Sequence, residues 1–383
     1  MDERYNNEGM PVETTEKTTE EIQDDATVER SFFQRMPWNR MGLVFLLVGG
    51  IMFAIAWGMG VRGGYLFFEN GSLVVQVERT GERGGAVHPL PALGQNVNEV
   101  IIDARAINVT VRTTTGEPRL VLYGGFTPDI RFENGTLTIN TQDAERQRSW
   151  ALQIGVSGGP SRVARLYLPH NMAVNTLHVD VQSGNVRVYD VEGSNLTIDA
   201  RSGNIRLNNT NFAYVGARTR SGNIHLDGDA QDIVLYTQTG NVRIYNVQGH
   251  SADVYARTGN IHFTRTTFDY IAVQSRTGNI HVNSGNVRGL QLYVPTGNIH
   301  VTTHTQPDAN IHLESRSGNI RFTHEGGTAS TTAHLELSTR SGNVRVNGDR
   351  VVASGRYNRV VRDDAPTFTL HAATNSGNIH VNY

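Results

Sequence analysis

Residues 196–207 read LTIDARSGNIRL, and this stretch decides the fold. Before the glycine, apolar residues alternate with polar ones, which is the period-2 pattern of a half-buried β-strand. After Gly203 and Asn204 the alternation resumes with Ile205 and Leu207. Because glycine readily takes the positive φ that a sharp corner needs, the stretch predicts two strands joined by a Gly-Asn corner.

The tetrapeptide [Ser/Thr]-Gly-Asn-[Ile/Val] of this stretch recurs along the chain. Its glycines are separated by 19, 19, 18, 19, 19, 19, 21, 24 and 35 residues. A nearly fixed period of this kind is typical of repeat architectures. A further copy at residues 284–287 falls between two regular ones and is interpreted as a loop. The asparagines of the regular copies are Asn185, Asn204, Asn223, Asn241, Asn260, Asn279, Asn298, Asn319, Asn343 and Asn378.

Two all-β architectures explain the repeat. In the first, Gly-Asn is a hairpin turn and the chain forms a meander or a sandwich. In the second, each unit of ~19 residues is one coil of a parallel β-solenoid, or β-helix, of about ten coils. We favour the solenoid because every strand position recurs together with the corner. Stacked coils lie about 4.8 Å apart, so the ten asparagines would form a structural ladder of amides that donate and accept at once. Asn378, near the chain end, is expected to have only one neighbouring rung.

Three segments precede the repeats, which are expected to occupy residues 169–383. Residues 1–40 carry ten acidic and five basic side chains without an apolar period, and this composition predicts a disordered acidic tail. Residues 41–61 contain no charge and are long enough to cross a bilayer core of ~30 Å as one transmembrane helix. Residues 62–168 are strand-like, with a predicted hairpin at Asn134-Gly135, and are expected to cap the solenoid.

The apolar segment is interpreted as a retained anchor. A cleaved signal peptide is the alternative, but forty polar residues precede the apolar run. Arg30, Arg35 and Arg40 lie before the span, and the positive-inside rule therefore predicts a cytoplasmic N-terminus. The repeat domain would then be extracytoplasmic, attached to the cell membrane by a single span.

Composition excludes several classes of function. The chain has no cysteine, so disulfide frameworks, thiolate metal sites and cysteine catalysis are excluded. A formal net charge of −2 excludes a wholesale basic nucleic-acid binder, and we expect no nucleic-acid partner. There is no phosphate loop, dinucleotide fingerprint or nucleophile elbow, and no cofactor is expected.

Residues 164–188 resemble a known bacterial family. The lead-in ARLYLP at 164–169 and the first repeat LHVDVQSGNVRV at 177–188 are similar to those of the DUF4097 "putative adhesin" β-strand-repeat proteins. The resemblance extends over residues 96–383. It implies a right-handed β-helix-like fold, an envelope location and no assigned catalytic residue. Many members carry Asp where this chain carries Asn, so the ladder here is uncharged and no site residue is carried over.

Parallel β-helices also host polysaccharide lyases and hydrolases, whose sites need clustered carboxylates. Asp180 and Asp199 are expected in one outward column of adjacent coils, followed by Arg218. This column resembles an acid pair or a Ca²⁺ site, but a third carboxylate is missing. We therefore interpret it as a partly self-neutralised solvated row and expect no catalytic site.

Two columns of cations form the candidate polyanion-binding surface. The first column lies just before the Ser/Thr of the corner and contains Arg201, Arg220, Arg257, Arg276, Arg316 and Arg340. The second lies two residues after the asparagine and contains Arg187, Arg206, His225, Arg243, His262, His281, His300, Arg321, Arg345 and His380. Parallel stacking keeps the imidazoles of the second column from converging on a tetrahedral centre, so we expect no metal site.

Like charges at ladder spacing repel unless they are paired, so cations repeated along a rod indicate an extended anionic partner such as a cell-wall polymer or a polysaccharide. The alternative is a solvated face neutralised by outward Asp and Glu. The sequence thus predicts a non-catalytic, membrane-anchored envelope protein used for adhesion or for binding extended anionic polymers. An envelope-stress sensor, signalling to a cytoplasmic regulator through residues 1–40, is the second hypothesis, and a β-helix polysaccharide lyase or hydrolase is the third.

Overall fold

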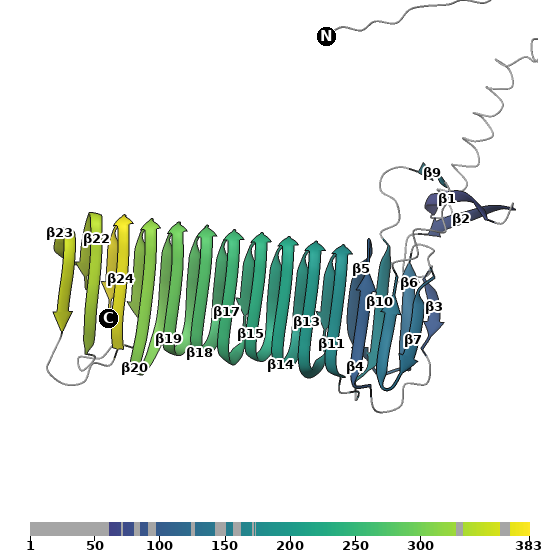
Figure 1. Ribbon diagram of the computed structural model, residues 1–383, viewed down its shortest axis with the longest axis horizontal. Helices are drawn as coiled ribbons and strands as arrows, with labels where there is room; N and C mark the ends of the chain where they lie inside the picture. Colours follow the sequence, from purple (N-terminus) through teal and green to yellow (C-terminus); the bar gives the residue numbers. More distant parts are fainter. Residues whose placement is uncertain are drawn as a thin grey trace, which may run out of the picture. The chain divides into compact units, whose positions relative to one another are not determined.

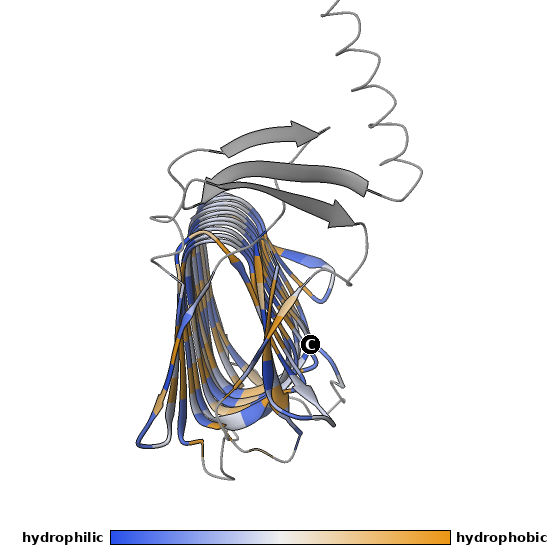
Figure 2. Cartoon of the chain, turned by 90° about the vertical axis from the view of Figure 1, so that its right-hand side faces the viewer, coloured by the Kyte–Doolittle hydropathy of each residue, from blue (hydrophilic) through white to orange (hydrophobic). Residues whose placement is uncertain are grey.

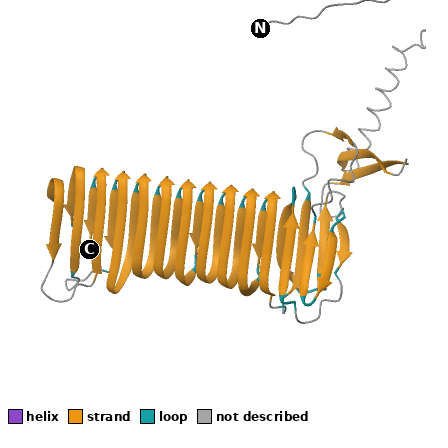
Figure 3. Ribbon diagram, in the orientation of Figure 1, coloured by secondary structure: helices purple, strands orange, loops and turns teal. Residues whose placement is uncertain are grey.

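The computed structural model describes residues 61–69, 72–79, 85–90, 97–123, 127–141, 151–155, 162–170, 172, 174–326, 332–360 and 368–383. All regular secondary structure in these ranges is β-strand (Figure 3). Among these residues no helix is long and apolar enough to cross a membrane. The predicted tail and residues 41–60 of the predicted span lie outside the described residues, and Val61, the last residue of that span, begins the first strand.

The strands fall into two sheets. A three-stranded sheet consists of β2 (Ser72–Arg79), β1 (Val61–Glu69) and β9 (Ala151–Gly155), with β1 and β9 antiparallel. All other described strands belong to one large sheet of 22 strands (Figure 1). Its strands before the repeats are β3 (Ala86–Pro89), β4 (Glu99–Ala104), β5 (Asn108–Thr114), β6 (Arg119–Tyr123), β7 (Asp129–Glu133), β8 (Thr136–Asn140) and β10 (Val163–Pro169).

The repeat region supplies the remaining strands of the large sheet. They are β11 (Val174–Ser183), β12 (Val186–Tyr189), β13 (Glu192–Ser202), β14 (Ile205–Ser221), β15 (Ile224–Thr239), β16 (Val242–Tyr245), β17 (Gln248–Thr258), β18 (Ile261–Thr277), β19 (Ile280–Thr296), β20 (Ile299–Ser317), β21 (Ile320–His324), β22 (Ala333–Val346), β23 (Asp349–Val360), β24 (Phe368–Ser376) and β25 (Ile379–Asn382).

Each repeat forms one coil that pairs in parallel with its neighbours. Between β14 and β15, Ile205 pairs with Ile224, and Ala217 with Leu235. Residues one period apart therefore stack on one another, and the all-β, solenoid-like expectation is confirmed. In each coil we call the segment after the Gly-Asn corner the post-corner strand and the segment leading to the next corner the pre-corner strand. A tight turn, here called the opposite turn, joins the two.

The core lies between the pre-corner and post-corner strands. Alternate residues of both strands point inward and are buried, as the pattern of β14 shows, so the outward positions form two solvent-facing faces. Figure 2 looks along the stack, where successive coils superpose around this interior. Phe212, Phe263 and Phe268 are fully buried, and burying each such side chain contributes about 1.5–3 kcal/mol.

Glycine is required at the corner for a steric reason. Gly278 has a φ of +135°, and a Cβ added there would lie 2.0 Å from the carbonyl oxygen of Gly259 in the preceding coil. The opposite turn is built differently, because Asn209 and Arg265 take positive φ values of 50° and 53° with their side chains present. At these two positions of the opposite turn a side chain is therefore tolerated, whereas the corner glycine excludes one.

The segment expected to cap the array itself contains a coil. Strands β4 and β5 pair in parallel with β11 and β12, and Asn108 occupies the corner position although no tetrapeptide surrounds it. β8 and β10 then continue the two faces beyond β4 and β5. The hairpin predicted at Asn134-Gly135 joins β7 to β8 in antiparallel fashion, with φ values of 53° and 79° at these two residues.

The far end of the array departs from sequence order. β24 pairs with β20 on one side and with β22 on the other, so the last strands insert before β22. β23 then covers β22 in antiparallel pairing. The expectation that Asn378 has only one neighbouring rung was wrong, because it lies between Asn319 and Asn343. The antiparallel hairpin of β22 and β23 is the outermost element and protects the last edge. Asn343 is the outermost ladder residue.

Candidate binding surface

The corners align into an edge held by a ladder of asparagines. The backbone N–H of Asn204 donates to Oδ1 of Asn185 at 2.9 Å, and the Asn204 amide donates to the same oxygen at 3.1 Å. The backbone bond repeats at 2.8–2.9 Å from rung to rung. In spatial order the rungs are Asn108, Asn185, Asn204, Asn223, Asn241, Asn260, Asn279, Asn298, Asn319, Asn378 and Asn343. We call this line of corners the corner edge.

The two cationic columns lie on either side of the corner edge. The second column is on the outer face of the post-corner strands, where Arg206 pairs with His225, and His262 with His281. The first column is on the outer face of the pre-corner strands, and its six arginines, Arg201, Arg220, Arg257, Arg276, Arg316 and Arg340, are all exposed. In space the second column runs Arg187, Arg206, His225, Arg243, His262, His281, His300, Arg321, His380 and Arg345.

Within the part of the chain that the structure describes, no cation of either column forms an ion pair with a carboxylate. Arg206 instead donates from Nε to Oδ1 of Asn208 at 2.7 Å, a neutral partner. Outward carboxylates exist elsewhere on the coils, but they do not reach these side chains. The two columns therefore keep their positive charge exposed along the corner edge.

The histidines of the second column are stacked and partly desolvated. Their ring centroids are 5.8 Å apart between His262 and His281, and 4.8 Å apart between His281 and His300. Burial lowers the pKa of His262, with the nearby His281 and Arg243 adding to the effect. Burial likewise lowers the pKa of His300, followed by the charges of His281 and Arg321. The neighbouring cations thus oppose protonation of the free protein.

The acidic column contains one carboxylate more than the sequence predicted. Asp103 of β4 pairs with Asp180, and Asp180 pairs with Asp199, so three carboxylates share one row. Burial raises the pKa of Asp180, and the charges of Asp103 and Asp199 raise it further. Arg218 lies beyond, with its Nε 3.8 Å from Oδ1 of Asp199. Sequence reasoning missed Asp103 because its coil lacks the tetrapeptide.

Neither acids nor histidines converge on a cation position. In the described ranges, no group of three or more histidine, aspartate or glutamate side chains is arranged to hold a metal ion. The row formed by Asp103, Asp180 and Asp199 runs along the stack at coil spacing, so its carboxylates lie side by side instead of facing one another across a cleft. An acid/base pair that flanks a bond needs such a cleft.

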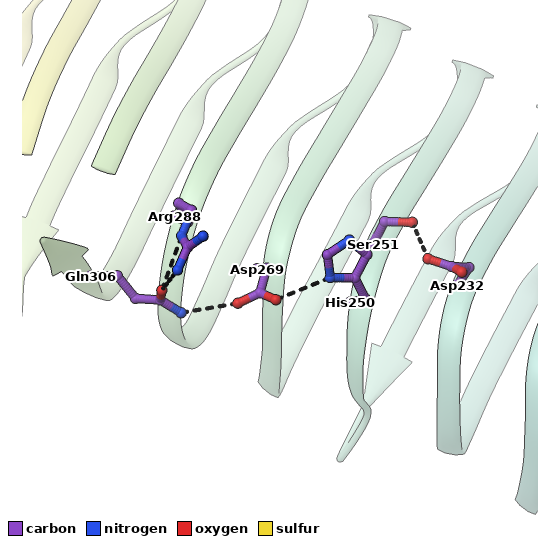
Figure 4. Close-up of polar contacts among 6 residues, drawn as sticks. All are labelled: Asp232, His250, Ser251, Asp269, Arg288 and Gln306. Atoms are coloured by element: carbon purple, nitrogen blue, oxygen red, sulfur yellow. Dashed lines mark hydrogen bonds and ion pairs between the residues drawn. The ribbon is translucent and has the colours of Figure 1, made fainter. Parts of the chain in front are cut away.

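Near the opposite turn, a serine, a histidine and an aspartate lie close together (Figure 4). His250 Nδ1 is 3.0 Å from Oδ2 of Asp269, as in a hydrolase dyad. The hydroxyl of Ser251, however, donates to Oδ1 of Asp232 and not to His250. His250 is therefore not placed to take the proton of this serine, so the group does not form a Ser-His-Asp triad.

The polar side chains of this cluster hydrogen-bond to one another. Gln306 Nε2 donates to Oδ1 of Asp269 at 3.0 Å, and Arg288 donates from Nε and Nη2 to Oε1 of Gln306 at 3.3 and 3.2 Å (Figure 4). The hydrogen bonds from Gln306 and His250 lower the pKa of Asp269. We call this chain of contacts, which also includes the Ser251–Asp232 bond, the opposite-turn network.

The chain is similar to one protein family and to several solved structures. The family model described as Toastrack DUF4097 matches residues 97–230 and 229–382. A solved "putative adhesin" from Parabacteroides distasonis is 11% identical, with 79% of this chain and 98% of that one covered and a TM-score of 0.42. One from Bacteroides fragilis is 12% identical, with coverages of 78% and 95% and a TM-score of 0.35. A "putative lipid binding protein" from Parabacteroides distasonis is 11% identical, with coverages of 78% and 98% and a TM-score of 0.36. No curated protein matches the chain.

Proposed function

The chain belongs to the Toastrack DUF4097 family, and we propose that it is a non-catalytic, membrane-anchored envelope protein whose extracytoplasmic repeats bind extended anionic polymers. Binding of this kind serves adhesion to a wall polymer or polysaccharide. In this proposal residues 1–40 are cytoplasmic and residues 41–61 form the single span. The solenoid then acts as a rigid scaffold that presents one binding element per coil.

The observation that carries the proposal is the unpaired charge along the corner edge. Eleven arginines and five histidines flank the ladder on its two sides, and none of them is paired with a carboxylate among the described residues. Each coil adds one or two of these side chains at intervals of about 4.8 Å. A polyanion laid along the corner edge relieves the repulsion between these neighbours, and the rod gains binding energy from every coil that the polymer crosses.

The second column makes such binding sensitive to pH. The pKa of His225 and that of His380 are lowered, first by burial and then by neighbouring arginines. An anion next to the column favours the protonated rings, so binding of a polymer takes up protons. Affinity should therefore be higher at pH 5.5 than at pH 7.5, and should fall as salt screens the charges.

Calorimetry of the full chain with an alginate oligomer and with inorganic polyphosphate tests the proposal. A variant with Arg257, Arg276 and Arg316 changed to Gln should bind both anions at least tenfold more weakly. The charge-matched control changes Arg131, Arg265 and Arg288 to Gln, which are exposed arginines outside both cationic columns. Equal losses in both variants would show that only net charge matters and would overturn the corner edge as the binding surface.

Topology needs its own test. Protease added to intact cells should digest the repeats and leave the segment before Arg40 protected. In cells with permeabilised membranes the protease should digest both segments. Protection of the repeats in intact cells would overturn the proposed orientation and, with it, the access of the rod to external polymers.

A further inference from the structure

A shallow groove lies on the outer face of the pre-corner strands, beside the first cationic column. Its volume is about 480 Å³, and it extends from Arg218 of β14 to His312 of β20. The side chains that form it occupy the outward positions four and six residues before each corner glycine. Three of them are the tyrosines Tyr236, Tyr255 and Tyr293. Sequence reasoning missed this row because it followed the inward positions and the charges.

The tyrosines form a stack with one interruption. Tyr236 and Tyr255 occupy adjacent coils, with ring centroids 5.0 Å apart and ring planes only 7° from parallel. The next position in the row is Gln274, and the one after it is Tyr293. At about 4.8 Å per coil, the rings of Tyr255 and Tyr293 are separated by roughly 9.6 Å, with only an exposed amide between them. This gap has an aromatic face at each end.

The polar groups around the gap are unpaired. No hydrogen bond or ion pair joins Asp253, Gln274 or Gln291 to another described residue. In the opposite-turn network, by contrast, the glutamine and aspartate side chains are hydrogen-bonded. An amide offers a donor and an acceptor, and a carboxylate offers acceptors, so together they match the hydroxyl groups of a sugar ring. The C–H faces of a sugar carry slight positive charge and are attracted to the negative faces of tyrosine rings.

The cations stand on one side of the gap only. Arg257 follows Tyr255 by two residues, and Arg276 follows Gln274 by two, so each points to the same face as the groove. Asp253 precedes Tyr255 by two residues and lies on the other side of the row. A sugar in the gap thus meets an acceptor on one flank and two unpaired guanidinium groups on the other.

We propose that this groove binds an acidic sugar unit of a polysaccharide, with the ring between Tyr255 and Tyr293 and the carboxylate on Arg257 and Arg276. The inference rests on the proposed function and narrows the anionic polymer to an acidic glycan. Polyphosphate and simple phosphate headgroups such as that of phosphatidylglycerol offer charge but no ring for the gap. Because the gap lies beside the first cationic column, a glycan seated in it continues along the corner edge.

Titration of the full chain with an alginate oligomer, a uronate polymer, tests this, with polyphosphate as the anion that lacks sugar. Changing Tyr255 and Tyr293 to Ala should weaken alginate binding at least tenfold and change polyphosphate binding less than twofold. The matched control changes Tyr214 and Tyr270 to Ala. These tyrosines are 37% and 45% exposed on the same face, and neither lines the groove. The control should change neither affinity.

A second variant fills the gap without removing any aromatic ring. Gln274→Tyr would complete the stack and should weaken alginate binding as strongly as the double alanine variant. If Gln274→Tyr and the alanine variant both retain alginate binding while the variant lacking three corner arginines loses it, the groove is not the sugar site, yet the proposed function stands. If neither anion binds the unaltered chain, the proposed function fails and this inference fails with it.

Discussion

The corner edge and the opposite turn are the two ends of every coil, and they treat polar side chains in contrary ways. At the opposite turn, His250, Asp269, Gln306 and Arg288 bond to one another across successive coils. At the corner edge the neutral asparagines interlock, and no carboxylate of the described residues pairs with the cations on either side. Both ends face water and repeat at the same spacing. The coil spacing therefore allows charged side chains to pair from coil to coil, as the opposite-turn network shows. The proposed polymer binding rests on the cations of the two columns having no such carboxylate partner among the described residues.

The largest effect is expected from a side chain at a corner glycine. Gly278→Ala would place a Cβ 2.0 Å from a backbone oxygen at a φ of +135°, and should destabilise the fold by more than about 3 kcal/mol. Arg265→Ala, at the opposite turn of the coil before that corner, keeps a Cβ where one already exists and should cost less than about 1 kcal/mol. Urea unfolding of the two variants measures the difference, and equal losses would contradict the contrast between the two ends.

The asparagine ladder should give the next largest effect. Asn260→Leu leaves the backbone N–H of Asn279 without its acceptor and should cost about 1–3 kcal/mol. Asn343 is the outermost rung, so the backbone N–H of no further rung depends on its side chain. Asn343→Leu should therefore cost less than about 1 kcal/mol. Thermal melts of both variants provide the comparison, and a larger loss at Asn343 would argue against the observed order of the rungs.

The histidines should make stability fall as the solution is acidified. The pKa of His262 and that of His300 are lowered from 6.5, so below pH 6.5 the unfolded chain takes up protons that the folded chain resists. Stability is then complete above pH 6.5 and declines as pH falls below it. Changing both residues to Gln should flatten the dependence of unfolding free energy on pH between 7.5 and 5. An unchanged slope would show that the column does not titrate as described.

The smallest effect is expected at the opposite turn, in a separate pH range. Hydrogen bonds from Gln306 and His250 lower the pKa of Asp269 from 3.8. The stability that these hydrogen bonds supply is fully present above pH 3.8. It is lost as the pH falls through the lowered pKa of Asp269 in the folded state. Asp269→Asn should remove that acid-range loss with little change at pH 7, because the pair is exposed. Acid titration followed by circular dichroism would detect it, and a shift near pH 6.5 instead would contradict the assignment.

The sequence predicted the parts of the fold that carry the repeated tetrapeptide and missed those that lack it or depart from sequence order. The spacing of Gly203-Asn204 and its copies predicted the parallel coils, because like residues must stack once the period is fixed. It could not predict the coil at Asn108, where only Asn108 and Val109 of the motif remain, and so Asp103 was missed. Sequence order also misplaced Asn378, since strand pairing at the last edge follows the availability of unpaired backbone and not position along the chain.

Among the candidate site residues, periodicity placed each cation in its column and on its face. It could not show which of them would be paired, because pairing depends on side-chain reach between coils. Asp269 reaches His250, whereas no described carboxylate reaches Arg257 or Arg276. The sequence shows that Gln274 interrupts the row of tyrosines. That the interruption leaves a gap between aromatic rings follows only from the stacking of Tyr236 on Tyr255 in the structure.

The insertion of β24 and β25 ahead of β22 governs how the array can be completed during synthesis. Coils up to β20 and β21 can assemble one after another as the chain emerges, each on the edge left by the previous one. The hairpin of β22 and β23 emerges next, but its parallel partner β24 is made later and docks on β20 as well. The edge of β20 therefore stays open until residues 368–383 leave the ribosome. These residues then form β24 and β25 and fill the position between β20 and β22, two strands that were synthesised earlier.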